Sequence, residues 1–222
     1  MPSFSLQFWH VWPHLDALVQ GALLTIMLTV QAAGVGLIAS LVGAYALMSG
    51  VKPAAALART YVEVIRNTPF LVQLLFIYFS LPSIGIQVSA NQAALMTMIM
   101  NFTGYTIEIL RGGIQSIPAA QLDSARSIGF SKVQTFFHVV APQAMRNTYP
   151  SLTSQFSLLL LGSSVVSAIS AEDLTAAANY IQSLNFRSFE VYLVTAGFYL
   201  ALTALCRITF AAIWRMTFHR WE

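Results

Sequence analysis

The chain has 222 residues, of which 57% are hydrophobic and only 9% are charged. A soluble domain carries about a quarter charged residues, so this composition excludes an ordinary soluble protein and indicates the lipid bilayer as the solvent. The length fits one compact unit, and a formal charge of +3 scattered along the chain gives no sign of nucleic-acid binding. Because Cys206 is the single cysteine and the four histidines are dispersed, we expect neither a disulfide nor a metal site.

Apolar segments, taken in chain order, predict an all-α membrane protein with five transmembrane helices. The first segment has no charged residue between Asp16 and Lys52, which is more than the roughly 20 apolar residues that cross a bilayer. Lys52-Pro53 separates it from the second segment, which ends at Leu81-Pro82. The predicted spans are about 17–48, 56–81, 91–111, 150–171 and 189–214, and a polar loop covers 114–147 between the third and the fourth.

Basic residues predict the orientation, because Lys and Arg collect in cytoplasmic loops. Five spans put the two termini on opposite sides of the membrane. A cytoplasmic C-terminus leaves Arg187 as the basic residue of the outer loops. The inner face then carries Lys52, Arg59, Arg111, Arg126, Lys132, Arg146, Arg215 and Arg220. We therefore predict that the N-terminus is outside and that the C-terminus and the loop 114–147 are inside.

The polar loop contains the segment AAQLDSARSIGFSKVQ at 119–134. Pro118 can begin a short helix and Gly129 can end it, while Ser131 and Gln134 have the spacing of a capping box that begins a second helix. Pro142 is expected to end or kink that second helix. A loop lying on lipid headgroups is one interpretation. The small residues of the first helix favour contact with another protein instead: Ala119, Ala120, Ser124, Ala125 and Ser127.

This segment and the following VVAPQAMRNTYPSL resemble the cytoplasmic "EAA" loop of ATP-binding-cassette (ABC) importer permeases. The family pattern is Glu-Ala-Ala, three residues, Gly, and a Leu-Pro further on. This chain has Asp123 in place of the Glu, Ser124 in place of the first Ala, and Ala141 in place of the Leu. The matching positions are Asp123, Ser124, Ala125, Gly129 and Pro142. VWPHLDALVQGALLTIMLTV, YVEVIRNTPFLVQLLFIYFSLP and YTIEILRGGIQSIPAAQ, in the same order, resemble the polar amino-acid uptake subfamily, the histidine/glutamine/glutamate/arginine type.

The resemblance implies that the helix at 119–128 docks in a cleft of a separate ATPase subunit. Asp123 would anchor the helix at the rim, Ser124 and Ala125 would be small where the cleft wall is close, and Gly129 would let the chain turn. The chain has no Gly-x-x-x-x-Gly-Lys-Ser/Thr loop, so we expect it to have no site of its own for nucleotide phosphates. The resemblance further implies that the chain binds no cofactor and is a transporter subunit, not an enzyme. ATP and Mg²⁺ would be bound by the ATPase dimer.

Other partners follow from the same resemblance, which places the chain in the bacterial inner membrane. Five helices are too few to enclose a path, so a second permease, identical or different, is expected. An external substrate-binding protein would meet the outer face, where charged side chains could contact it or simply belong to a solvated loop: Glu172, Asp173, Arg187 and Glu190.

Ionisable and polar groups within the spans predict a substrate path. Glu63 lies on one helical face with Arg59 and Arg66 and could pair with either. Pro69 is expected to loosen the second span, and Tyr105 and Glu108 are expected to face one cavity, where a carboxylate would suit an ammonium group. Ion-paired helix ends are the alternative interpretation. The candidate path residues are Arg66, Thr68, Gln73, Tyr105, Glu108, Ser163 and Ser164.

The fourth span departs from the subfamily pattern. Such permeases often carry a Lys-Asp-Thr-Ser-like stretch, whereas residues 161–164 read LGSS, which keeps the hydroxyls and lacks the charges. Either the partner permease supplies charged contacts or the substrate is less polar. The predicted function is the membrane subunit of an ATP-driven importer for a polar amino acid or a related compound, with an ATP-independent channel or scaffold protein as the alternative.

Overall fold

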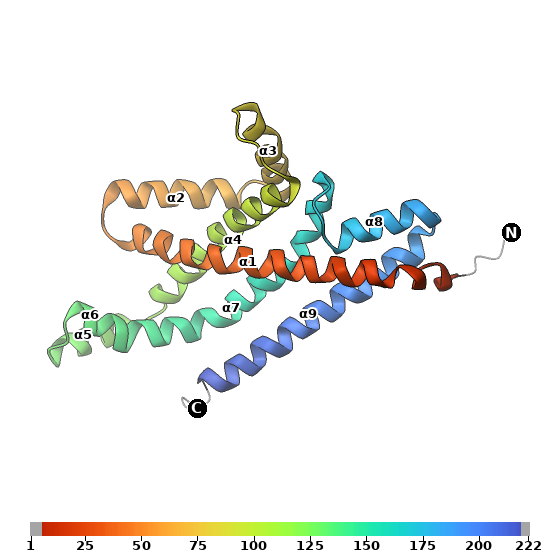
Figure 1. Cartoon of the computed structure of the whole chain (residues 1–222). Coiled ribbons are helices and arrows are strands. Elements are labelled where there is room, and N and C mark those ends of the chain that lie inside the picture. Colours follow the sequence, from red (N-terminus) through yellow and green to blue (C-terminus); the bar gives the residue numbers. More distant parts are fainter. Residues whose placement is uncertain (1–5, 219–222) are drawn as a thin grey trace.

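Long apolar runs form long helices, because hydrocarbon offers backbone groups no partner outside the helix. The computed structural model describes residues 6–218, within which the regular elements are all helical (Figure 1). Arg220, one of the basic residues that predict the orientation, lies outside the described residues. The long helices are α1 (Leu15–Met48), α4 (Ala90–Gln115), α7 (Ala141–Gly162) and α9 (Ser188–Phe218). The described part holds four helices long and apolar enough to cross a membrane, or up to five if a bent pair counts as one.

That bent pair consists of α2 (Lys52–Arg66) and α3 (Phe70–Ser83), which meet at 107°. Pro69 precedes α3 in an extended conformation with ψ of 139°, as expected for a residue that cannot continue a helix. Instead of the continuous span predicted at 56–81, the chain forms two helices, and α3 leaves the bundle at a steep angle (Figure 1). Pro69 therefore ends a helix instead of loosening it.

The contacts between α1 and α4 give the relative direction of these two helices. Gly36 lies against Phe102 of α4, and Gly43, further along α1, lies against Ile107. Contacts that advance together along both helices mean that α1 and α4 run parallel. The chain therefore returns from the end of α1 to the start of α4 through α2 and α3.

Small residues make the close contact between α1 and α4 possible. A side chain at Gly36 would come within 2.9 Å of the Phe102 ring, and one at Gly43 would collide with Ile107. Ser40 Oγ donates to the Gly36 carbonyl oxygen at 2.6 Å and to the Thr103 carbonyl oxygen at 3.3 Å. Close backbone approach with small residues and interhelical hydrogen bonds is a usual way to join helices in a membrane.

The helix that contains the predicted span 150–171 begins much earlier, at Lys132. Helical structure is continuous from Lys132 to Ile169 through α6 (Lys132–Thr135), the π-helical turn η3 (Phe136–Val140), α7 and the 3-10 segment η4 (Ser163–Ile169). Pro142 lies in the first turn of α7 and does not end the helix. The wider π turn just before it offers a place for a proline that cannot donate a regular hydrogen bond.

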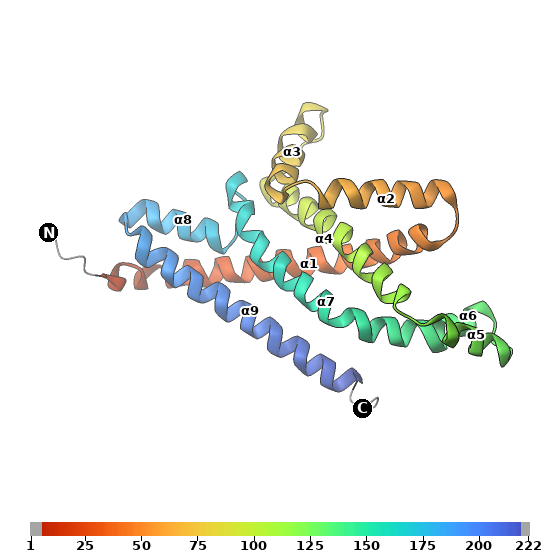
Figure 2. The same ribbon diagram turned by 180° about the vertical axis from the view of Figure 1, so that it is seen from behind.

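The remaining elements flank this bundle. Two short 3-10 turns, η1 (Phe8–His10) and η2 (Trp12–His14), precede α1. Between α4 and α6 lies α5 (Ala119–Ser127), and α8 (Leu174–Asn185) packs on α1 and α9 at the opposite end. α9 forms one edge of the molecule (Figure 2), and few of its side chains are buried: Glu190, Val191, Thr195, Leu202 and Phe218. Much of its apolar surface is thus left for lipid or a partner.

Candidate substrate path and coupling segment

A cavity of about 490 Å³ lies where α2 breaks from α3, between that break, α4 and α7. Three of the predicted path residues line it: Arg66, Thr68 and Tyr105. Asn101 of α4 and Gln155 of α7 also line it, and neither was predicted from the sequence. The signal that could have found them is a neutral amide inside an otherwise apolar span, because such a group needs a partner away from lipid.

Arg66 joins the break to α4. Its Cζ atom lies 5.6 Å from the centre of the Tyr105 ring, within the range of a cation–π contact. Its Nη1 atom is 3.8 Å from Oε2 of Glu108. The guanidinium is partly open to the cavity, so it can meet an anionic group there while one aromatic ring and one carboxylate hold its position.

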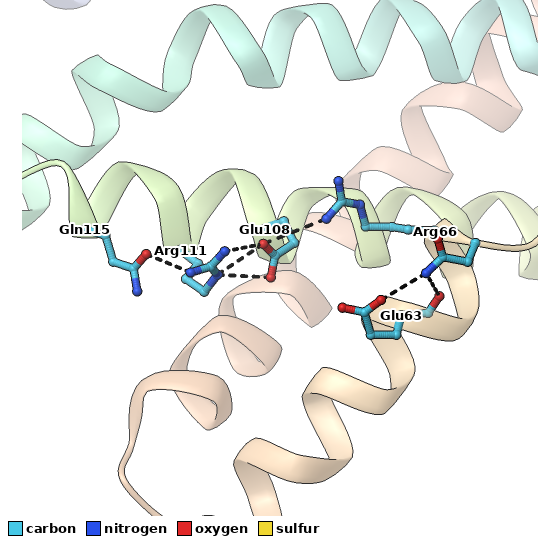
Figure 3. A network of polar contacts seen from close by, with 6 residues as sticks. Glu63, Arg66, Glu108, Arg111 and Gln115 are labelled. Carbon is cyan, nitrogen blue, oxygen red and sulfur yellow. Dashed lines mark hydrogen bonds and ion pairs between the residues drawn. The ribbon is translucent and has the colours of Figure 1, made fainter.

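Glu108 is the centre of a charge network on α4 (Figure 3). Arg111 donates to its carboxylate through Nη2 at 2.6 Å and Nε at 3.1 Å, and Arg111 Nη1 donates to Oε1 of Gln115 at 2.7 Å. Glu108 lines a separate cavity of about 520 Å³, whereas Tyr105 lines the cavity at the break. Tyr105 and Glu108 therefore line different cavities. The Glu108 carboxylate, which was expected to suit an ammonium group, already pairs with Arg66 and Arg111.

Glu63 does not make the ion pair predicted for it. Within residues 6–218, no arginine nitrogen lies within 4 Å of its carboxylate. Asn67 Nδ2 instead donates to Glu63 Oε2 at 3.0 Å and to the Glu63 carbonyl oxygen at 2.8 Å. Asn67 thereby caps the end of α2, and Arg66 is free to turn toward Glu108.

Gln73 holds the break in place. Its buried amide donates to the carbonyl oxygens of Ile65 at 2.7 Å and Thr68 at 2.8 Å, which the end of α2 leaves without helical partners. Asn101 Nδ2 donates to Gln73 Oε1 at 3.2 Å and so connects the break to the cavity wall. Gln73 thus stabilises the break that forms one wall of the cavity, although it does not line the cavity itself.

Ser163 and Ser164 do not line the cavity at the break, although the neighbouring Gly162 does. Ser163 is buried and donates to the Leu160 carbonyl oxygen at 2.7 Å. Ser164 donates to the Leu161 carbonyl oxygen at 2.8 Å. Both hydroxyls satisfy carbonyls at the end of α7.

The hairpin formed by α5 and α6 follows its local signals closely. Gly129 has φ of +87°, and Phe130 N–H donates to the Ala125 carbonyl oxygen at 3.0 Å in the pattern of a Schellman motif. Ser131 and Gln134 form both hydrogen bonds of a capping box at the start of α6. The structure thus confirms the predicted helix, its end at Gly129 and the start of the second helix.

The residues predicted to contact an ATPase differ in their exposure on the hairpin. The Asp123 side chain is 68% exposed and pairs with Arg126 at 3.1 Å, and Ser124 is also exposed. Ala125 is only 4% exposed because it packs inside this chain, so its small size does not reflect an external wall. Ile128 is 71% exposed, which leaves an apolar side chain at the tip of the hairpin.

Two of the four outer charges are buried and make structural contacts. Asp173 accepts from Ala176 N–H at 2.7 Å and from the Tyr199 hydroxyl at 3.2 Å, which caps α8. Burial raises the pKa of Asp173 above its usual range. Glu190 is also buried and accepts from Gln7 N–H at 3.0 Å. These two carboxylates are therefore not exposed contacts for a binding protein.

A bundle of membrane-crossing helices, with a polar cavity at a broken helix and an exposed hairpin at one end, has the architecture of a transport permease subunit. The chain belongs to the family "Binding-protein-dependent transport system inner membrane component", which matches residues 17–215. It is therefore the inner-membrane permease subunit of an ABC importer and is not an enzyme, because ATP hydrolysis belongs to a separate subunit of such systems. An ATPase and a substrate-binding protein are the general partners of this family.

Several named proteins are similar to this chain. The glutamine transport system permease protein GlnP of Escherichia coli K12 is 32% identical over 195 residues, which cover 87% of this chain and 89% of that protein. The probable glutamine ABC transporter permease protein GlnM of Bacillus subtilis is 36% identical over 152 residues, covering 68% and 70%. The crystal structure of an amino acid ABC transporter with histidines has a TM-score of 0.90 at 34% identity, over 96% of this chain and 100% of that one.

Proposed function

We propose that this permease forms part of the translocation path for a polar amino acid or a close relative. The cavity at the break between α2 and α3 carries the proposal, because it combines a cationic side chain with two neutral amides: Arg66, Asn101 and Gln155. Its volume of about 490 Å³ is in the range of small-molecule sites. Relatives named for glutamine, nopaline, octopine and cystine transport support the substrate class.

Each polar group of the cavity has a chemical role in this proposal. The Arg66 guanidinium would meet the substrate carboxylate, since planar paired donors match a carboxylate well. Asn101 and Gln155 would exchange hydrogen bonds with the polar end of the substrate. Thr68 lines the same cavity beside the break and adds a hydroxyl. Glu108 would act indirectly by holding Arg66 and Arg111, and Gln73 would keep the break open.

We further propose that the hairpin is the element that couples the permease to its ATPase. Asp123 and Ser124 would face the ATPase cleft together with Ile128, and Gly129 would keep the turn that presents them. The parallel packing of α1 and α4 supports five traversals, and hence termini on opposite sides of the membrane. Lys132, Arg126 and Arg111 lie at the hairpin end of the bundle, which supports a cytoplasmic hairpin by the distribution of basic residues.

The same proposal specifies the assembly. Two permeases, identical or different, would pair and cover apolar surface such as that of α9. ATP and Mg²⁺ would bind to the ATPase dimer below the hairpins, and the binding protein would deliver substrate at the α8 end, outside. Among the outer charges, Glu172 and Arg187 remain available for it, since both are at least partly exposed.

Uptake by membrane vesicles that contain the full transporter tests the path. Arg66→Gln should raise the KM for a substrate such as glutamine about 10- to 100-fold, the value of a hydrogen bond to a charged group. Arg59→Gln is the matched control, because Arg59 lies on the same helix as Arg66 but lines the separate cavity that Glu108 lines. Glu108→Gln removes the ion pair but leaves the guanidinium, and it should change the KM less than Arg66→Gln does.

Two results would contradict the proposal. An unchanged KM in Arg66→Gln would show that the guanidinium does not meet the substrate. Solute flux through the reconstituted permease alone, without an ATPase, would favour the channel alternative.

A further inference from the structure

Another cavity lies at the hairpin end of the bundle, apart from the proposed substrate path. Its volume is about 410 Å³, and it is bounded by the last turns of α1, the last turns of α4 and the hairpin. Most of its wall is apolar. The principal apolar side chains are Leu41, Met48, Leu110, Ile114, Phe130 and Phe136.

The α1 side of this cavity is open to the surroundings of the protein. Leu41 is 55% exposed and Met48 is 42% exposed, although both belong to a helix that crosses the membrane. Leu41, Tyr45 and Met48 follow one another at helical spacing, so they form a continuous apolar stripe along α1. A stripe of this kind beside an apolar cavity fits a hydrocarbon chain lying along the helix.

The hairpin side of the cavity carries positive charge. Arg126 and Lys132 both line it. Arg126 pairs with Asp123 at 3.1 Å, whereas in the part of the chain that the structure describes no carboxylate lies within 4 Å of the Lys132 ammonium. One uncompensated cation therefore lies next to an apolar cavity.

A buried hydroxyl without a partner lies in the same wall. Thr135 lines the cavity, is 8% exposed, and its Oγ1 atom has no hydrogen-bond partner among residues 6–218. Such a group costs stability until it finds an acceptor or donor. Thr135 lies one helical turn after Lys132, so a rotation about χ1 would let its hydroxyl reach an oxygen held near the ammonium.

We propose that this cavity binds an anionic phospholipid of the inner leaflet. Its acyl chain would lie between α1 and α4, and its phosphate would meet Lys132 and Arg126 at the base of the hairpin. A free phosphate ion would use the charges but not the apolar wall, and a zwitterionic lipid would leave Lys132 without a net counter-charge. The proposal rests on the orientation proposed for the hairpin, which puts this end of the bundle at the inner membrane surface, where anionic lipids attract basic groups.

Native mass spectrometry of the full chain tests this directly. The protein is taken from nanodiscs that contain equal parts of phosphatidylglycerol and phosphatidylethanolamine, and the lipid it retains is identified by mass. Wild type should retain phosphatidylglycerol in preference. Lys132→Gln should lower the bound fraction about fivefold, the usual effect of one basic residue at an anionic surface. Leu41→Trp, which fills the cavity and keeps the charges, should lower it as well.

Lys52→Gln is the matched control, because Lys52 is the other lysine of the chain, is exposed and does not line the cavity. It should retain lipid as wild type does. Equal retention of the two lipids, or equal retention by wild type and Lys132→Gln, would overturn the proposal.

Adding the ATPase subunit or a second permease copy separates lipid from protein as the occupant. Loss of the bound lipid on assembly would show that a protein surface covers the cavity, and this too would overturn the proposal. The readout is bound lipid and not uptake. A failure of the proposed substrate path or of the coupling role therefore leaves this measurement unaffected, and each can fail separately.

Discussion

The helix break between α2 and α3 and the hairpin between α5 and α6 are both interruptions of a membrane helix bundle, but different forces hold them. The break is tied to another helix, because Asn101 of α4 donates to Gln73, and Gln73 in turn donates to the carbonyl oxygens of Ile65 and Thr68, eight and five residues before it. The hairpin is held by bonds between near neighbours, at Gly129 and at the Ser131 capping box. The break thus depends on a contact with another membrane helix, whereas the turn of the hairpin is set by residues close to it in the chain.

Removing the Gln73 amide should have the largest effect on stability. Gln73→Leu would leave the Ile65 and Thr68 carbonyls without these donors and should lower the free energy of unfolding by about 2–4 kcal/mol. Thermal unfolding in detergent measures the loss. Gln121→Leu in the hairpin is the matched control, because the Gln121 side chain is exposed and, among residues 6–218, accepts a hydrogen bond only from Gln143 Nε2, at 2.7 Å. Similar losses in both variants would contradict the distinction between the two regions.

A side chain at Gly129 tests the local turn of the hairpin. Gly129→Leu should destabilise the hairpin by about 1–2 kcal/mol, because φ of +87° is strained for a branched side chain. Co-purification with the ATPase and uptake should fall with it, as a displaced α5 cannot dock. Gly129→Asn, which tolerates this conformation better, should restore much of both. A Gly129→Leu variant that retains the ATPase and full uptake would remove the coupling role from this segment.

The buried Asp173 predicts a pH dependence of stability. Its folded pKa is raised by burial, so between the unfolded pKa, about 3.9, and the folded pKa the native state binds more protons than the unfolded state. Stability therefore falls as pH rises through that window. Asp173→Asn keeps a capping side chain and should lack this fall. Asp173→Ala should be equally flat and about 1 kcal/mol less stable, because it loses the cap. Parallel pH curves of wild type and Asp173→Asn would argue against a raised pKa.

The smallest effect on stability is expected at the tip of the hairpin. Asp123→Asn breaks an exposed ion pair with Arg126, and such pairs contribute about 0–1 kcal/mol. Its unfolding temperature should stay close to wild type, whereas Asp123→Lys should weaken binding of the ATPase in a pull-down from detergent. A large fall in the unfolding temperature of Asp123→Asn would mean that this residue stabilises the permease instead of serving a partner.

The same distinction explains what could be predicted from the sequence. The hairpin was predictable because Gly129, Ser131 and Gln134 act within a few residues of one another. Pro69 indicated an interruption, but a bend of 107° depends on Gln73 and Asn101, whose partners no local pattern reveals. The continuous helix through Pro142 was missed for a similar reason, because the π turn before it has no simple signature.

Burial of charge was the hardest feature to predict. Asp173 and Glu190 stand in a polar stretch that reads as an outer loop. Their partners Tyr199 and Gln7 lie 26 and 183 residues away in the chain, so only the folded structure brings them together. Arg66 lies toward Glu108 of α4, 42 residues away in the chain, whereas Glu63 accepts from its near neighbour Asn67.

The continuous helix from Lys132 to Ile169 has a mechanical consequence. Its 38 residues correspond to a rod on the order of 55 Å, well beyond the hydrocarbon thickness of a bilayer. One end is part of the hairpin and the other ends beside α8, at the opposite face. In the proposed coupling, a displacement of the hairpin by an ATPase would act on one end of this rod, which passes the polar cavity, and the π turn near its base is where the rod would bend.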